Sequence, residues 1–340
     1  MEPLPLAGVR VLEIGGGIPA AFATRWMAGF GADVVRTEGP PGSLTADEET
    51  YLLASKRRIA PPAAELPRLA LAAAILVEDG KPGTLAELGL DPGALRRATP
   101  GLVIVSITPF GQSGPYAAFE ATNIVSFAMG GIMSITGSPD APPLQTGGSQ
   151  AQYLGGLHAF GAALSAYYGS LVHGEGDWVD ISLQECAAGM LELFGPRTEY
   201  MDTGPHLRSG NHVSAVEGIY PTADGYGGVC TLARQIPALF QVVAHPAFED
   251  PRFHDPITRL EVDDELRAIL YAWFATRTRA EILDLGRKHR IPFGAVLSPA
   301  DLLASPALAA RHIFDSAETP AGEVAVPGRP VRGRPRAPRP

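Results

Sequence analysis

Short apolar runs alternate with helical and glycine-rich stretches through the first half of the chain. Residues 9–14 form an apolar run with β-branched side chains, and the three glycines at 15–17 interrupt it. Residues 19–30 have helical character, and residues 32–36 form a second apolar run. This pattern predicts a strand, a turn, a helix and a second strand. Since the connection is long enough only for a crossover, we expect parallel neighbouring strands with the helix on one face of an α/β sheet.

The same alternation continues further along the chain. Residues 69–78 indicate a helix end that runs into a short strand, and residues 85–95 indicate a helix. Residues 102–108 and 178–183 indicate two further strands. Four or five such strands with helical connections predict a Rossmann-like, doubly wound sheet. The loop at residues 110–115 follows the carboxyl end of a predicted strand, where open α/β folds bind ligands.

Residues 123–185 are mostly helical in pattern and rich in small side chains. Residues 123–137 indicate one helical stretch, and residues 151–174 indicate a second that contains Gly155, Gly156 and Gly161. Glycines destabilise a helix, so we expect another backbone or a ligand to approach this one closely.

Composition divides the chain into expected domains. We expect a large Rossmann-like domain over residues 1–195 and a small α+β domain over residues 196–290, because the composition shifts there to many prolines and glycines between residues 195 and 228. In the small domain, residues 218–221 and 227–231 predict strands, and residues 236–243, 264–274 and 280–289 predict helices. Residues 291–327 are expected to return to the large domain. Residues 328–340 are rich in proline and arginine and are expected to be disordered, as an idle terminus or a basic arm for an acidic partner.

Length and charge narrow the class of protein. The chain has 340 residues, of which 46% are apolar, and a net charge of −9, which argues against nucleic acid as the main partner. Cys186 and Cys230 are the only cysteines, so the sequence predicts no disulfide framework, no metal site and a reducing, cytoplasmic location. Without a signal peptide or an apolar run of about 18 residues, we expect no membrane association.

Two features are compatible with a phosphate-bearing ligand. Residues 15–20 fit the pattern G-x-G-x-x-A after a strand, and Glu38 follows at about the distance of a ribose-binding acid. Against this, Pro19 lacks one N–H near the helix start, and a tight turn alone needs glycine. A nicotinamide or flavin site and a simple tight turn therefore remain alternatives. Lys56, Arg57 and Arg58 are interpreted either as neighbours of ligand phosphates or as a solvated surface turn.

Motifs along nearly the whole chain resemble, in the same order, those of the family III CoA-transferases, which include formyl-CoA and carnitine CoA-transferases and α-methylacyl-CoA racemase. The motifs include PLAGVRVLE at 5–13, GADVVRTE at 31–38, KPG at 81–83, SITPFGQSGPY at 106–116, GEGDWVDISL at 174–183, RSGN at 208–211 and IPFG at 291–294. The resemblance implies a Rossmann-like large domain, a small domain and ring-like subunits interlocked in a homodimer. It also implies coenzyme A as co-substrate and assigns the turn at residues 15–20 to an acyl-CoA pocket.

The residue at the family's nucleophile position differs. In the family, an aspartate in a G-x-x-x-x-D segment attacks the acyl-CoA carbonyl, forming an aspartyl anhydride and then an aspartyl-CoA thioester. The matching segment here spans residues 147–156 and has Gln152 at that position. A neutral amide is a poor nucleophile, so this chemistry is excluded there unless another acid substitutes. For the racemase branch, the resemblance assigns the catalytic positions to Thr122, Gln152 and Ala233, none of which can abstract an α-proton.

The resemblance also assigns the CoA-binding side. Ile18 stands where formyl-CoA transferases have Gln, Asp79 where Asn is common, and Glu87 near an expected Arg. Carboxylates beside CoA phosphates would repel them. The expected CoA-binding residues are Gly16, Gly17, Ile18, Pro19, Arg36, Asp79 and Glu87.

Several residues are candidates to replace the missing acid. His158 lies six residues after Gln152 and is interpreted either as a catalytic group or as a buried structural histidine. The candidate acids, each also interpreted as a surface or capping residue, are Asp140, Glu185, Glu199 and Glu217.

Three hypotheses follow. The chain is an acyl-thioester transferase with a replaced nucleophile, or an isomerase, lyase or cyclase in which Gln152 orients the acyl carbonyl of a CoA-free or carrier-bound substrate, or a non-catalytic binding homologue.

Overall fold

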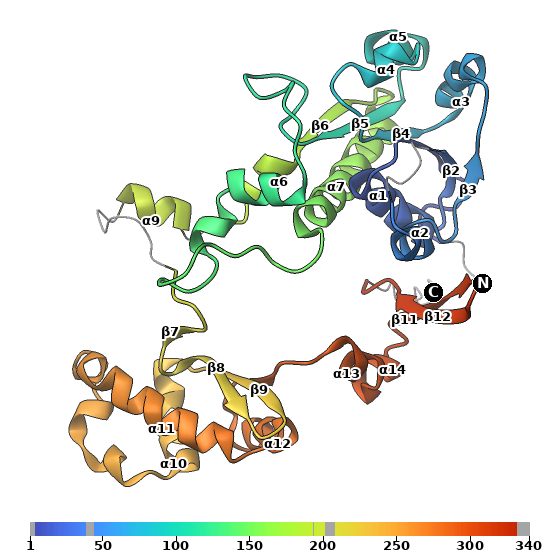
Figure 1. Cartoon of the computed structure of the whole chain (residues 1–340). Coiled ribbons are helices and arrows are strands. Elements are labelled where there is room, and N and C mark those ends of the chain that lie inside the picture. Colours follow the sequence, from blue (N-terminus) through green and yellow to red (C-terminus); the bar gives the residue numbers. More distant parts are fainter. Residues whose placement is uncertain (1–3, 39–43, 193, 201–207, 332–340) are drawn as a thin grey trace, which may run out of the picture. The chain divides into compact units, whose positions relative to one another are not determined.

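The structure, a computed structural model, describes residues 4–38, 44–192, 194–200 and 208–331. The chain divides into two compact units (Figure 1). Unit 1 comprises residues 1–134, 144–206 and 307–340, and unit 2 comprises residues 135–143 and 207–306.

Unit 1 is built around a six-stranded parallel sheet in the order β3-β2-β1-β4-β5-β6. Its strands are β1 (Arg10–Ile14), β2 (Asp33–Thr37), β3 (Arg57–Ile59), β4 (Ile75–Glu78), β5 (Val103–Thr108) and β6 (Trp178–Ser182). The predicted parallel pairing of the first two strands is confirmed. The strand order reverses between β1 and β4, and the carboxyl edge at such a switch point is the usual ligand site of an open α/β sheet.

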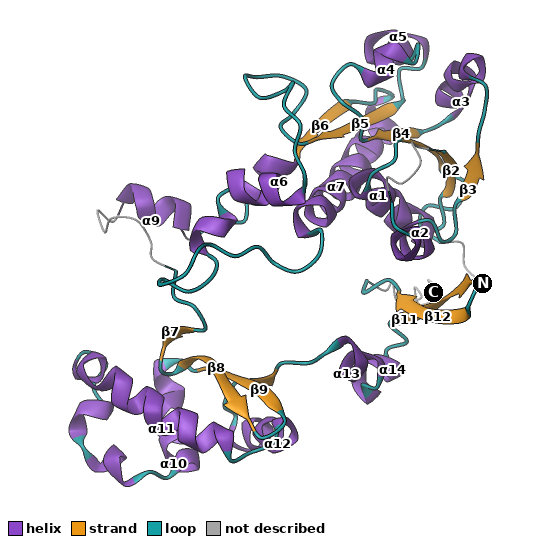
Figure 2. Ribbon diagram, viewed as in Figure 1, coloured by secondary structure: helices purple, strands orange, loops and turns teal. Residues whose placement is uncertain are grey.

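Helices cover both faces of this sheet because successive strand residues point to opposite sides. Val11 packs in a core with residues of α1 (Ile18–Gly29) and α7 (Gln150–His173). Its neighbour Leu12 packs in a second core with α3 (Leu66–Ala72), α4 (Thr84–Glu87) and α5 (Pro92–Ala98) (Figure 2). The predicted doubly wound α/β architecture is therefore confirmed. Unit 1 also contains α2 (Ala46–Leu52), α6 (Asn123–Met129), α8 (Leu183–Ala188) and α9 (Phe194–Tyr200).

Two of the predicted helices were wrong in extent. Instead of one helix over residues 85–95, α4 and α5 are separate, because Gly89 has φ 74° and the Asp91 side chain accepts the Ala94 N–H at 2.7 Å to start α5. The helical stretch predicted over residues 123–137 also breaks. α6 ends before Gly130, Gly131 has φ 86°, and a short 3₁₀ turn follows over Ile132–Ile135.

The close approach predicted for the glycines of α7 is confirmed, and the partners are protein. A Cβ atom at Gly156 would lie 2.7 Å from the Pro19 carbonyl oxygen of α1, and one at Gly155 would lie 2.1 Å from Leu183 Cδ2. By contrast, no atom lies within 4 Å of a Cβ built at Gly161. The first turns of α7 therefore pack directly on the first turn of α1.

Gly156→Ala is expected to lower the free energy of unfolding by about 2 kcal/mol, because the obstructing atom is backbone and cannot move to another rotamer. Gly161→Ala is the matched control and is expected to be neutral or stabilising by up to about 1 kcal/mol. Urea unfolding followed by circular dichroism measures both. Equal effects of the two substitutions would contradict the close contact.

Unit 2 has an antiparallel sheet in the order β10-β9-β8-β7. Its strands are β7 (His212–Ser214), β8 (Glu217–Thr222), β9 (Gly225–Cys230) and β10 (Phe293–Ala295). Its helices are α10 (Ile236–Val243), α11 (Asp263–Ala275), α12 (Arg279–His289) and α13 (Pro299–Leu303), and α14 (Pro306–Ala310) spans the boundary to unit 1. Tyr220, Phe253 and Phe274 are central to its core. The strands and helices predicted for this region are confirmed.

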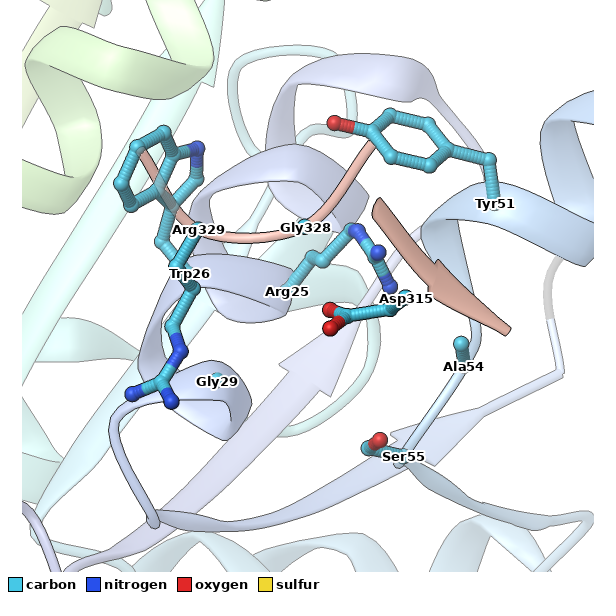
Figure 3. Close-up of a pocket in the computed structure, with 9 residues that line it drawn as sticks. All are labelled: Arg25, Trp26, Gly29, Tyr51, Ala54, Ser55, Asp315, Gly328 and Arg329. Atoms are coloured by element: carbon cyan, nitrogen blue, oxygen red, sulfur yellow. The ribbon is translucent and has the colours of Figure 1, made fainter. Parts of the chain in front are cut away.

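A C-terminal hairpin of β11 (Phe314–Thr319) and β12 (Gly322–Pro327) belongs to unit 1. Arg25 of α1 donates a hydrogen bond to the Pro327 carbonyl oxygen at 3.0 Å, and its guanidinium lies 4.3 Å from the Tyr51 ring centre. Figure 3 shows Arg25 between Tyr51 and Asp315, in a cavity of only about 60 Å³ that Arg329 also lines. This volume suits a few water molecules, so we interpret the cavity as a gap in the packing between α1 and the C-terminal hairpin, and not as a ligand site.

The tail predicted to be disordered begins at this hairpin. Gly328 N–H donates to the Ile313 carbonyl oxygen at 2.7 Å, and the Arg329 guanidinium lies 5.4 Å from the Phe30 ring centre. Residues 332–340 lie outside the described residues.

Candidate functional site

A cavity of about 560 Å³ opens at the carboxyl edge of the large sheet, within unit 1. Its walls come from the segment after β4, the end of β5 and the loop before α6. The lining residues are Asp79, Gly80, Lys81, Pro82, Pro109, Ala117, Ala118, Phe119, Glu120 and Ala121. The cavity adjoins the switch point between β1 and β4, where ligands of open α/β sheets bind. We take it as the candidate site.

The N-terminus of α1 is occupied by a carboxylate of the chain itself. Asp79 accepts the backbone N–H of Gly17 at 3.3 Å and of Ala20 at 3.2 Å. A Cβ atom at Gly15 would lie 2.1 Å from Asp79 Oδ1, and one at Gly17 would lie 2.5 Å from Oδ2. The glycines therefore make room for Asp79, and a pyrophosphate would meet an anion already in place. The Asp79 contact therefore argues against the nicotinamide or flavin alternative at this turn.

Burial raises the pKa of the Asp79 carboxyl group above its usual value. The hydrogen bonds from the Ala20 and Gly17 N–H groups act in the opposite direction and offset part of this rise. Ile18, another expected ligand contact, is instead buried against Leu44 and Leu52, and Pro19 is buried beside α7. Gly16 lies half-buried in the same turn. The structure thus brings Gly16, Gly17, Ile18 and Pro19 close to Asp79, and the contact that joins this turn to Asp79 is a pair of hydrogen bonds within the chain.

Arg36 lies in a buried ion cluster on the sheet. Its guanidinium pairs with Glu13 of β1, whose other oxygen accepts Lys56 Nζ at 2.9 Å and Thr24 Oγ1 at 2.6 Å. The Lys56 side chain has no exposed surface, and burial lowers its pKa to about 8. Burial alone raises the pKa of Glu13, but the two cations lower it below its usual value. Both cations are therefore engaged by Glu13.

The surface-turn interpretation of the triplet that begins at Lys56 is wrong for that residue, whose side chain has no exposed surface. The other interpretation, that it neighbours ligand phosphates, stays a prediction. The sequence does not reveal the burial of Lys56, because its partner Glu13 lies 43 positions away. The other two residues are exposed and pair with carboxylates, Arg57 with Asp33 at 2.8 Å and Arg58 with Glu49 at 3.2 Å.

Glu78, at the carboxyl end of β4, is a buried acid that sequence reasoning missed. Its Oε2 accepts the Gly80 N–H at 2.8 Å, and its carboxyl group also hydrogen-bonds Ser106, which accepts Trp178 Nε1 at 3.0 Å. Burial, with smaller contributions from Asp79 and Asp180, raises the pKa of Glu78 to about 7. The sequence feature that could have indicated this buried acid is a glutamate at the end of an otherwise apolar strand.

The raised pKa of Glu78 predicts a pH effect on stability. The folded protein keeps this proton up to about pH 7, whereas an unfolded chain releases it near pH 4.5, so the stabilisation is complete below pH 4.5 and is lost as pH rises to 7. We expect the unfolding free energy of the wild type to fall by about 2–3 kcal/mol more than that of Glu78→Gln over this range. Urea titrations at several pH values measure the difference, and parallel curves would contradict it.

The starts of two helices meet beside the cavity. Asn123, the first residue of α6, accepts the Ala151 N–H at 2.9 Å and donates to the Gly148 carbonyl oxygen at 3.3 Å. This places exposed Thr122, the residue before α6, and half-buried Gln152, in the first turn of α7, at adjoining helix ends. Ala121, which lines the cavity, directly precedes Thr122. The Gln152 side chain makes no hydrogen bond to any described residue.

The other candidates lie on surfaces. His158 is exposed, and its Nδ1 donates to the Leu154 carbonyl oxygen at 3.0 Å, so the buried-histidine interpretation was wrong. The helix turns this residue outward, because the buried face of α7 follows Gly155, Gly156 and Ala159. The four candidate acids are exposed, as their surface interpretation predicted, namely Asp140, Glu185, Glu199 and Glu217.

Charged side chains flank the opening of the cavity. Lys81 pairs with Glu120, and both side chains are about three-quarters exposed. The hydrogen bond and charge of Glu120 raise the pKa of Lys81, with a smaller contribution from Glu87. Glu87, exposed on α4, thus adds negative charge near this lysine.

Across the described parts of the chain, no group of three His, Cys, Asp or Glu side chains is placed to hold a metal ion. None of the helices described there has the length and apolarity to cross a membrane.

Comparison with known proteins decides the family. The model of CoA-transferase family III matches residues 6–50 and 62–339. The chain belongs to CoA-transferase family III. Succinyl-CoA:D-citramalate CoA-transferase of Chloroflexus aurantiacus is 32% identical over 336 residues, which cover 91% of this chain and 83% of the relative. Succinate:glutarate CoA-transferase of Agrobacterium fabrum is 30% identical over 357 residues, which cover 95% and 88%.

A solved family III structure supports the same assignment. The crystal structure of a CAIB/BAIF family protein from Brucella suis has a TM-score of 0.86 and 27% identity to this chain. The similarity covers 98% of this chain and 94% of the Brucella chain. The α/β fold with its six-stranded parallel sheet is therefore that of a family III member.

Proposed function

We propose that this protein transfers CoA between carboxylic acids, with Gln152 at the position of the family's nucleophilic aspartate. The observation that carries the proposal is the meeting of α6 and α7 at Asn123, which brings the first turn of α7, where Gln152 lies, close to the segment that contains the cavity residue Ala121. The names of the relatives support the reaction class, since they describe CoA-transferases that use succinyl-CoA, citramalate, succinate and glutarate.

The chemistry proposed for Gln152 avoids an acyl-enzyme. A carboxylate oxygen of the acceptor acid attacks the thioester carbonyl carbon, the C–S bond breaks, and the electron pair leaves with sulfur as the CoA thiolate. A mixed anhydride of the two acids remains in the site. The thiolate then attacks the acceptor's carbonyl carbon in the anhydride and releases the donor acid as its carboxylate. The Gln152 amide N–H donates a hydrogen bond to the oxygen on which negative charge develops.

Kinetics and trapping test this proposal together. With both substrates varied, initial rates are expected to give intersecting double-reciprocal lines, because donor and acceptor must be bound at once. Intact mass after borohydride or hydroxylamine treatment during turnover is expected to show an unmodified chain. Parallel lines with a trapped adduct would overturn the direct transfer and identify a replacement nucleophile.

A second candidate function is favoured because the cations expected to bind phosphate are already paired with a carboxylate of the chain. Asp79 occupies the N-terminus of α1, while Arg36 and Lys56 are engaged by Glu13, so the expected phosphate contacts are weakened. This favours an isomerase, lyase or cyclase acting on a CoA-free or carrier-bound acyl group, which Gln152 would orient. Calorimetric titration with CoA separates the candidates. No heat at millimolar CoA would reject the transferase and favour the second function.

We also propose that the protein acts as a homodimer, in keeping with its family resemblance. The exposed face of α7 carries apolar side chains that a partner subunit would cover, namely Leu157, Tyr168, Leu171 and Val172. Light scattering on the eluting protein is expected to give twice the chain mass, and a monomer mass would reject the dimer.

A further inference from the structure

The edge strand β7 of unit 2 is attached to its sheet largely through one histidine ring. The strand is three residues long, and its register with β8 shifts between His212 and Ser214 (Figure 1). The His212 ring centre lies 4.7 Å from that of Tyr220 in β8 and 5.5 Å from that of Tyr271 in α11. A Cβ atom at Gly218, the partner of His212 in β8, would lie 2.2 Å from His212 Cδ2. The ring therefore packs on a glycine, between two tyrosine rings.

The surroundings of this ring favour its neutral form. Nε2 of His212 is buried and makes no hydrogen bond to any described residue. The charged groups that face the ring, Arg267 and Asp263, both come from α11. They pair with each other at 2.6 Å, and the other oxygen of Asp263 accepts the Ala215 N–H at 2.9 Å. Tyr220 is also engaged, because its hydroxyl donates to the Ala215 carbonyl oxygen.

A neutral ring can leave Nε2 without a proton, whereas an imidazolium places a charged N–H there with no partner. Burial lowers the pKa of His212 below its usual value, the Arg267 charge lowers it further, and the Asp263 charge opposes both in part. Protonation of His212 is therefore disfavoured while β7 stays packed on unit 2.

The chain next to β7 holds together the two segments of unit 2. Arg208, four positions before His212, donates from Nε to the Ser138 carbonyl oxygen at 3.0 Å and from Nη2 to the Ala141 carbonyl oxygen at 2.7 Å. Both acceptors belong to residues 135–143, the separate first segment of unit 2. The position of β7 thus bears on how this segment is attached.

We infer that His212 is a pH-sensitive contact, whose neutral ring keeps β7 on unit 2 and whose protonation releases β7 and loosens the attachment of residues 135–143. The released segment takes up the proton near pH 6.5, the ordinary value for histidine, and the packed ring takes it up only at lower pH. The contact is therefore complete above about pH 6.5 and weakens as the pH falls below it. The inference concerns unit 2 alone and does not depend on the proposed function.

Hydrogen–deuterium exchange of the full-length protein, followed by mass spectrometry, tests the release. Between pH 7.5 and pH 5.0, the protection of amides in residues 208–214, corrected for the intrinsic exchange rate, is expected to fall about tenfold. Residues 135–143 are expected to lose protection in parallel, whereas residues 225–230, which form β9, are expected to keep theirs. Equal corrected protection of residues 208–214 at the two pH values would overturn the inference.

Variants assign the effect to His212. His212→Phe keeps an aromatic ring without a titratable nitrogen, so the protection of residues 208–214 is expected to become independent of pH. His289→Gln is the matched control, because His289 is exposed on α12 of the same unit, and the wild-type pH dependence is expected to remain. Thermal unfolding verifies that each variant folds. A folded His212→Phe variant that keeps the wild-type pH dependence would overturn the assignment.

A direct titration decides the matter even if His212→Phe does not fold. Nuclear magnetic resonance of histidine-labelled protein is expected to show His212 titrating below about pH 6.5 in the wild type. Arg267→Gln removes the cation and leaves Asp263 facing the ring, so the midpoint is expected to rise by about one pH unit. A His212 midpoint at or above 6.5 in the wild type, or one unchanged in folded Arg267→Gln protein, would overturn the inference.

Discussion

Glu13→Gln is expected to lower the free energy of unfolding by about 3–5 kcal/mol, because it leaves two buried cations without their anion. Lys56 Nζ lies 2.9 Å from Glu13 Oε2 with its side chain fully buried, and Arg36 is 4% exposed on the neighbouring strand. Neither cation can reach water without disrupting the contact between β1, β2 and α1. Chemical unfolding at pH 7, monitored by circular dichroism, measures the loss.

Two control variants make this prediction specific. Lys56→Met removes one cation but leaves Glu13 paired with Arg36, so we expect a clearly smaller loss than for Glu13→Gln. Asp33→Asn breaks the exposed pair with Arg57, and we expect less than about 1 kcal/mol. If Glu13→Gln cost no more than Asp33→Asn, the cluster would not be a buried ion network in solution.

Strands and long helices could be predicted because their signal is local. The apolar runs that became β1, β2 and β5, and the helix that became α7, are visible in windows of a few residues. Helix ends were harder to predict. The break between α4 and α5 depends on one positive φ at Gly89 and one cap at Asp91, which a periodic pattern does not reveal.

The candidate site was less predictable, because its contacts join distant segments. Asp79 reaches Gly17 across 62 positions, and Asn123 reaches Ala151 across 28. The glycine turn was therefore predicted in its shape, but the contact of its N–H groups with the Asp79 side chain was not. Lys81 and Glu120, 39 positions apart, were likewise invisible as a pair, although each is an ordinary charged residue in a loop.

These contacts bear on how the site handles charge. A carboxylate at the N-terminus of α1 satisfies N–H groups that would otherwise attract a ligand anion. Arg36 and Lys56 are engaged by Glu13, and Lys81 is the positively charged side chain among the described residues that line the cavity. In the proposed function, Arg36 and Lys56 would therefore have to leave Glu13 before either could contact a CoA phosphate.

Gln152→Asp is expected to convert the proposed direct transfer into covalent catalysis. The substitution puts a carboxylate in the first turn of α7, where the helix N-terminus stabilises negative charge, beside the start of α6. Attack by this carboxylate on an acyl thioester splits the reaction into two easier steps through an enzyme-bound anhydride. Intact mass after hydroxylamine treatment with acyl-CoA is expected to change from an unmodified chain to an aspartyl hydroxamate adduct on a large fraction of the chains, with CoA or the acid as the leaving group. The kinetic lines are expected to change from intersecting to parallel.

Gln150→Asp is the matched control for this gain of chemistry. It adds the same carboxylate two residues earlier, at an exposed position at the start of α7, and is expected to give no adduct and no change in kinetic pattern. Side chains two residues apart on a helix point to different sides, so only one of the two carboxylates can face the thioester. If folded Gln152→Asp protein binds acyl-CoA without forming an adduct, Gln152 does not occupy the nucleophile position. An adduct in both variants would instead indicate nonspecific acylation of exposed carboxylates.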